Sequence, residues 1–182
     1  MKKFLYSALA GLSALATATP SFAGNTFDDH VDLFKALQEV GVTIKLNHKA
    51  RCESGETDGG YASDLAFMVI CQDNAVAGGE QVRWTENDLD TLRHEAHHVI
   101  QDCAVGTISD GDLGLFFWEE GKLTEFLNNS SWTRAQLTEL SKMLREQGLS
   151  WDEVKIELEA YTVASDIDAS LIAKKVRSWC TE

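Results

Sequence analysis

The segment from Leu89 to Cys103 combines an amphipathic helix pattern with two histidines spaced four residues apart. Its apolar residues recur at intervals of three and four, which predicts a helix with one face packed inward: Leu89, Leu92, Ala96, Val99 and Cys103. On that helix His94 and His98 lie on one face and can hold a single zinc ion, while Glu95 faces the water bound to it. Two histidines leave a hydrolytic zinc site one protein ligand short. The chain must therefore bring a third donor to this helix from elsewhere in the fold.

The rest of the chain divides into a mixed N-terminal part and a helical C-terminal part. Periodicity predicts a helix over 28–40, strands over 42–46 and 65–71, and a loop in the polar, glycine-bearing stretch 47–60. Thr85 is a good N-cap for the histidine-bearing helix. Further helices are predicted over 117–126, 132–147, 151–164 and 166–179. These elements indicate an α+β fold in which a small N-terminal sheet precedes the histidine-bearing helix and a mostly helical C-terminal half.

The N-terminus has the features of a secretory signal peptide. Lys2 and Lys3 supply the positive start, residues 4–16 form an apolar core, and Ser21-Phe22-Ala23 is a small-x-small cleavage site. The apolar core is too short to span a bilayer of about 30 Å. We therefore expect residues 1–23 to be removed, and residues 24–182 to form one secreted or periplasmic domain.

Four cysteines remain after this cleavage: Cys52, Cys71, Cys103 and Cys180. An even number in an oxidising compartment favours two disulfides over a thiolate metal site. Three pairings are possible. We favour Cys52 with Cys71, because both flank a probable loop and strand, which leaves Cys103 with Cys180.

The formal net charge is −13, and it becomes more negative when the signal peptide is removed. Such a charge repels nucleic acid and anionic membranes, so neither is an expected partner. We take the acidity to serve solubility, and we expect a monomer.

Residues His94-Glu95-Ala96-His97-His98 form an HExxH motif. No histidine follows His98, so the longer HExxHxxGxxH arrangement is absent and the third ligand is predicted to be a carboxylate. The best supplier is the helical segment 154–161. Here the chain resembles the gluzincins, zinc peptidases whose third ligand is a glutamate on a helix after HExxH, in several families within E-x-x-A. Glu157-Leu158-Glu159-Ala160 fits this pattern with Glu157 as the ligand. Glu159 is the alternative, since two residues turn a helix by about 200° and only one of the pair can face the metal.

This resemblance implies a zincin-like fold and a zinc metallopeptidase that hydrolyses peptide (amide) bonds of a peptide or protein substrate, with Glu95 as general base. Small secreted gluzincins also show a cysteine, an aromatic residue, a strand and a second cysteine before HExxH, similar to Cys52, Tyr61, 65–70 and Cys71. The strand 65–70 is expected to offer its edge to an extended peptide.

Tyr161 departs from the gluzincin pattern, because many members have an aspartate four residues after the glutamate ligand, where it orients a ligand histidine. A phenol there can hydrogen-bond near the ligands or stabilise an oxyanion, so Tyr161 is a candidate catalytic residue. His97 is expected to be a partly buried hydrogen-bonding residue, and His30 and His48 to lie on the surface. The alternative function is a zinc-containing structural or binding protein without turnover, which a buried, fully ligated zinc would favour.

Overall fold

The computed structural model, which describes residues 5–7, 25–53, 57–75, 83–117, 119 and 121–181, has an α+β fold with a small sheet and mostly helical content. The strands are β1 (Leu5–Ser7), β2 (Thr43–Leu46), β3 (Gly59–Ala62) and β4 (Phe67–Ile70). The helices are α1 (Phe27–Glu39), α2 (Lys49–Cys52), α3 (Glu86–Val105), α4 (Lys122–Asn128), α5 (Arg134–Glu146), α6 (Trp151–Asp166) and α7 (Ala169–Trp179). The predicted α+β class is confirmed.

The sheet has the strand order β1-β3-β4-β2. β4 pairs antiparallel with β3 and parallel with β2, so β4 is an interior strand. The prediction that the strand over 65–70 offers a free edge is therefore wrong. The predicted loop over 47–60 ends earlier in the structure, because Gly59 and Gly60 begin β3, and β3 needs a glycine at position 59. A Cβ on Gly59 would lie 2.6 Å from Thr91 Cγ2 and 3.0 Å from the carbonyl oxygen of Val69.

β1 pairs antiparallel with β3 and forms the outermost strand on that side, with Leu5 opposite Tyr61 and Ser7 opposite Gly59. This strand lies inside the predicted signal peptide, whose positive start and cleavage site fall outside the described residues. Removal of residues 1–23 would leave β3 as the edge of a three-stranded sheet.

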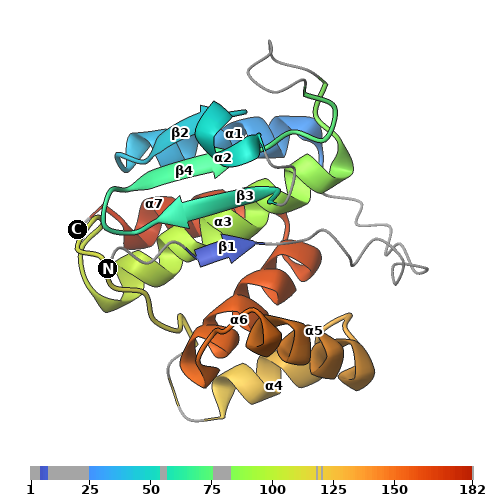
Figure 1. The fold of residues 1–182 in the computed structure, drawn as a ribbon. Coiled ribbons are helices and arrows are strands. Elements are labelled where there is room, and N and C mark those ends of the chain that lie inside the picture. Colours follow the sequence, from blue (N-terminus) through green and yellow to red (C-terminus); the bar gives the residue numbers. More distant parts are fainter. Residues whose placement is uncertain are drawn as a thin grey trace.

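Two hydrophobic clusters lie on either side of α3. Figure 1 shows α1, α3 and α7 packed behind the sheet, and α4, α5 and much of α6 gathered below it. The larger cluster joins the sheet to α1, α3 and α7 and includes Leu33, Leu37, Met68, Ile70, Leu92, Val99, Ile172 and Val176. The smaller one joins α5 to α6 through Leu140, Leu144, Val154, Leu158 and Tyr161. α3 therefore runs between the sheet and the lower helices.

The two central helices, α3 and α6, are buried on all sides over much of their length. Both begin with a capping box, Thr85 with Asp88 in α3 and Ser150 with Glu153 in α6. In α3 nearly every residue from Asp88 to Asp102 is buried, including the polar ones. Buried polar groups require partners. The partners of these groups define the candidate site.

Both disulfides have the predicted pairing. Cys52–Cys71 joins the end of α2 to the residue after β4, and Cys103–Cys180 joins the last turn of α3 to the chain after α7. In the part of the chain that the structure describes, no helix is both long and apolar enough to cross a membrane. The predicted helix over 117–126 is found as α4, which starts later, at Lys122, and α2 was not predicted.

Candidate metal centre

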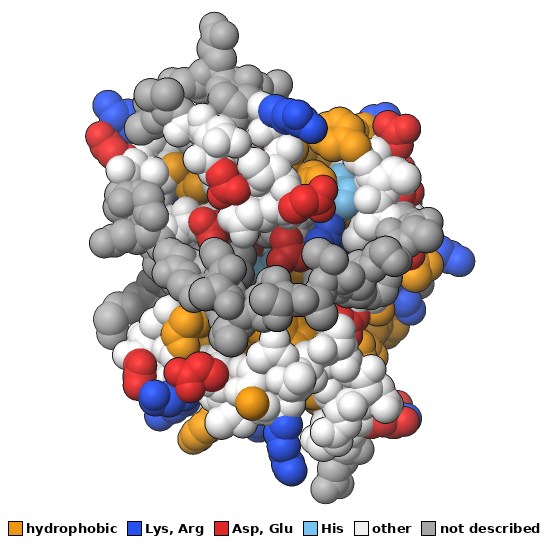
Figure 2. Space-filling view, turned by 90° about the vertical axis from the view of Figure 1, so that its right-hand side faces the viewer, with side chains coloured by type: hydrophobic (Ala, Val, Ile, Leu, Met, Phe, Trp, Pro, Cys, Tyr) orange, Lys and Arg blue, Asp and Glu red, His pale blue; other side chains and the backbone are white. Residues whose placement is uncertain are grey.

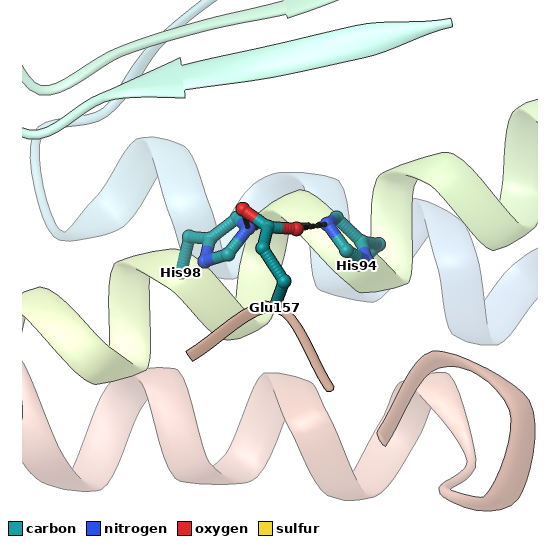
Figure 3. Close-up of side chains that lie close together, drawn as sticks. All are labelled: His94, His98 and Glu157. Carbon is teal, nitrogen blue, oxygen red and sulfur yellow. Dashed lines mark hydrogen bonds and ion pairs between the residues drawn. The ribbon is translucent and has the colours of Figure 1, made fainter. Parts of the chain in front are cut away.

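His94 and His98 on α3 meet the carboxylate of Glu157 on α6 (Figure 3). His94 Nε2 lies 3.3 Å from Glu157 Oε2, and His98 Nε2 lies 3.5 Å from Glu157 Oε1. The two Nε2 atoms are 3.1 Å apart. His94 and His98 are each 1% exposed and Glu157 is fully buried. The three groups predicted as metal ligands therefore converge on one buried point.

The spacing of these donors fits a metal ion. Tetrahedral zinc with bonds of about 2.0–2.1 Å holds its ligand atoms roughly 3.3–3.4 Å from one another. The two Nε2 atoms lie 3.1 Å apart, and each has a Glu157 oxygen, a different one in each case, at 3.3 or 3.5 Å, which is close to that value. Neither oxygen of Glu157 accepts a hydrogen bond of normal geometry, and a buried carboxylate without donors is costly unless a cation compensates it. The group can hold a metal ion, and it comprises three donors within the described residues.

Burial and mutual charge shift the pKa values of this cluster in opposite directions. Burial lowers the pKa of His94. Burial also lowers the pKa of His98, but the charges of Glu157 and Glu95 outweigh it and raise that pKa to about 9. Burial raises the pKa of Glu157, whereas the imidazoles of His98 and His94 lower it to about 2. The carboxylate is therefore ionised and ready to bind a cation.

Glu95, the predicted general base, lies on α3 between the cluster and β3. Its side chain is fully buried, and a Cβ on Gly59 would lie 3.4 Å from Glu95 Cγ. Its charge helps to raise the pKa of His98. Glu95 is thus beside both the donor group and the backbone of β3.

Tyr161 lies one turn after Glu157 on α6 and packs against a predicted ligand. Its ring centroid is 4.4 Å from that of His94, with the planes tilted by 57°, and 6.5 Å from that of Trp132. The residue is 4% exposed. The residue four positions after Glu157 thus packs an aromatic ring against His94.

Glu159, the alternative ligand, belongs to a second buried cluster. Its Oε1 lies 3.1 Å from His97 Nε2, and the backbone amides of Phe116 and Phe117 donate to its carboxylate at 3.0 and 3.2 Å. His97 therefore has the hydrogen-bonding role that we expected and is not in the donor group. Of the two glutamates, only Glu157 reaches His94 and His98.

The prediction that His30 lies on the surface is wrong. His30 is 2% exposed, its Nδ1 lies 2.8 Å from the carbonyl oxygen of Thr26, and Arg93 Nη1 donates to its Nε2 at 2.5 Å. Arg93 is itself buried, and His30 supplies one of its acceptors, beside Asp90 and the carbonyl oxygen of Ala164. His48 is exposed, as predicted.

Gln101 is a site residue that the sequence prediction missed. His98 Nδ1 donates to Gln101 Oε1 at 2.7 Å, and Gln101 is fully buried. The signal was its position three residues after His98, because residues i and i+3 are neighbours on one helix face.

Three comparisons of the chain, with protein-family profiles, with curated proteins and with solved structures, gave no match.

Proposed function

We propose that this protein is an exported, zinc-dependent metallopeptidase of the gluzincin type with a zincin-like fold. The observation that carries the proposal is the donor set: among the described His, Cys, Asp and Glu side chains, the group that could hold a metal ion has three members, His94, His98 and Glu157. Structural zinc sites usually have four protein ligands, whereas hydrolytic sites have three and leave a position for water. The donor types and their number therefore favour catalysis over a structural role.

The chemistry divides between the ion and the chain. An ion held by these residues would act as a Lewis acid and would lower the pKa of a bound water molecule towards about 7. Glu95 accepts the proton from that water and delivers it to the leaving amine nitrogen. His94, His98 and Glu157 hold the ion, and the ring of Tyr161 packs against His94. Burial of these groups strengthens their electrostatic interactions with a reacting amide.

An extended peptide pairing with β3 is the substrate geometry that we propose. The pairing of β1 with β3 supports it, since the outer edge of β3 accepts an antiparallel strand. Gly59 lies at one end of this edge and approaches Glu95 closely. A peptide in the place of β1 would therefore pass near the general base.

The charge and the disulfides support the remaining parts of the proposal. Acidic side chains gather in the upper half of the face shown in Figure 2, in keeping with the net charge of −13. We propose no nucleic-acid partner, because a negative field repels phosphates. Two disulfides are typical of proteins outside the cytoplasm, which supports secretion or a periplasmic location.

A zinc-binding protein without turnover is the second candidate. The observation that favours it is the burial of the donor group, since His94 and His98 are 1% exposed and Glu157 is fully buried. A closed site of this kind can stabilise a fold without admitting a substrate.

Glu95→Gln separates the two candidates. In the mature chain we expect the wild type to bind one zinc ion and to cleave unstructured peptides. Glu95→Gln should bind the same amount of zinc but cleave about 10²–10⁴ times more slowly, because the general base is lost. Metal analysis and a fluorogenic peptide assay measure the two effects. Equal zinc content with equal, background-level cleavage in both proteins would reject the peptidase and support the binding protein.

A further inference from the structure

The two nitrogens of the His98 ring face different partners. Nε2 points into the donor group, 3.1 Å from His94 Nε2 and 3.5 Å from Glu157 Oε1. Nδ1 lies 2.7 Å from the side-chain oxygen of Gln101. A carbonyl oxygen can only accept a hydrogen bond, so Nδ1 must carry the proton in this contact. Nε2 is then the ring nitrogen left to bind a metal ion, which it can do once it has released its own proton.

The orientation of the Gln101 amide is set by its other end. Gln101 Nε2 donates to the carbonyl oxygen of Ile156 at 3.0 Å. That carbonyl is an acceptor only, so the amide cannot flip without bringing two oxygens together. Gln101 is fully buried, so no solvent molecule replaces either partner in the described structure. The side-chain oxygen is therefore held towards His98.

Gln101 also connects the two helices that carry the donors. It lies on α3, three residues after His98, and its Ile156 partner on α6 immediately precedes Glu157. The Gln101 side chain thus contacts His98 directly and hydrogen-bonds the backbone next to Glu157. In the described part of the chain His94 Nδ1 is buried without a hydrogen-bond partner, and the His94 ring is instead packed against Tyr161.

We propose that Gln101 is the positioning residue of the metal site: it keeps the proton of His98 on Nδ1 and fixes α6 so that Glu157 meets both histidines. The inference rests on the proposed metal binding. In many metal sites a carboxylate or a backbone carbonyl plays this part for a histidine ligand. Here a neutral amide does so, and it adds no charge to a site that already contains the carboxylates of Glu95 and Glu157.

Three variants of the mature chain test the proposal through metal affinity, measured by competition with a zinc chelator of known affinity. Gln101→Met keeps the length of the side chain but removes both hydrogen bonds, and we expect about 10–100-fold weaker zinc binding. Gln101→Glu keeps an acceptor for His98 and loses the donor to Ile156, so its affinity should lie between those of the wild type and Gln101→Met. Gln72→Met is the matched control. This substitution removes a buried side-chain amide that accepts a hydrogen bond from Asn47 and that is not a member of the donor group. It should leave the zinc affinity unchanged.

A spectroscopic readout separates positioning from general loss of stability. In the zinc-loaded wild type and in Gln101→Glu, ¹⁵N-edited NMR should show a slowly exchanging proton on His98 Nδ1, and in Gln101→Met this signal should broaden or disappear. If Gln101→Met binds zinc as tightly as the wild type and keeps the signal, the role of Gln101 is rejected while the metal site stands. If the wild type itself binds no zinc, the proposed function fails first. If Gln101→Met does not fold, the zinc affinity and the His98 Nδ1 proton signal of Gln101→Glu test the proposal instead. Loss of that signal in Gln101→Glu would overturn the proposal.

Discussion

The buried histidine His30 shows how one residue couples local hydrogen bonding to stability. Its Nδ1 donates to the carbonyl oxygen of Thr26 and its Nε2 accepts from Arg93. Arg93 in turn donates to the carbonyl oxygen of Ala164 at the end of α6. Burial lowers the pKa of His30, and the charge of Arg93 lowers it further. The folded protein therefore needs His30 in its neutral form.

We predict that this histidine makes the protein less stable as the pH falls below about 6.5, the ordinary pKa of histidine. The folded-state pKa is lowered, so the unfolded chain binds more protons in this range and stability rises with pH. His30→Gln keeps an acceptor for Arg93 but does not titrate. Urea unfolding at about pH 5 and about pH 8 measures the free energy of unfolding of both proteins. The wild type should be more stable than His30→Gln at about pH 8, and this difference should be smaller at about pH 5. A difference independent of pH would contradict the prediction.

At the scale of the element, α6 presents two glutamates to two different neighbours. Glu157 faces the histidines of α3, whereas Glu159 holds His97 and the amides of Phe116 and Phe117. A shift of two residues on a helix turns the side chain by about 200°, so the two carboxylates point in nearly opposite directions. Glu157 belongs to the group that could hold a metal ion, and Glu159 accepts hydrogen bonds from the chain that follows α3.

Replacing each glutamate by alanine should therefore have distinct effects. We expect Glu157→Ala to lose tight zinc binding, because a direct donor is missing. Glu159→Ala should keep zinc but lose about 1–3 kcal/mol of stability, since His97 and two amides lose their acceptor. Metal analysis and chemical denaturation of both variants measure these outcomes. Loss of zinc from Glu159→Ala alone would show that the ligand assignment is wrong.

At the scale of the whole molecule, two covalent links and one strand pairing tie distant segments together. Cys103–Cys180 spans 77 residues and connects α3 to the C-terminal end of the described chain, while Cys52–Cys71 spans 19. β1 adds the N-terminal segment to the sheet through β3. The disulfides lower the entropy of the unfolded chain. The pairing of β1 covers the edge of β3 that we propose for the substrate.

The two disulfides should differ in their contribution to stability. Loop-closure entropy predicts about 4.5 kcal/mol for the longer loop and about 3 kcal/mol for the shorter one. The double variant Cys103→Ala/Cys180→Ala should therefore be less stable than Cys52→Ala/Cys71→Ala by roughly 1 kcal/mol. Denaturant unfolding of the two variants compares them directly, and the reverse order would argue that native-state strain outweighs entropy.

The precursor should be less active than the mature chain, because β1 covers the edge of β3 that we propose for the substrate. Peptide cleavage by residues 1–182 should be severalfold slower than by residues 24–182. Deletion of residues 5–7 from the precursor is the control, because it removes the strand that pairs with β3 and should restore activity. Equal rates for the precursor and the mature chain would show that β1 does not restrict access.

Features set by short-range spacing were predictable from the sequence. The histidine pair on a helix, the capping box at Ser150 and the helical C-terminal half depend on neighbours within about four residues, so periodicity reveals them. The even number of cysteines and their positions along the chain led to the correct disulfide pairing, since four cysteines allow only three pairings. The resemblance to gluzincins pointed to Glu157, but residue spacing alone left Glu159 open.

Only the tertiary structure decided the features that depend on packing between distant elements. The crossing of α3 and α6 selects Glu157 over Glu159 and gives Gln101 its partner at Ile156. β3 lies so close to α3 that only a glycine fits at position 59, which the sequence alone placed in a loop. The physical reason is common to both cases. A local pattern can show which face of a helix is apolar, but the segment that this face packs against depends on contacts between distant elements.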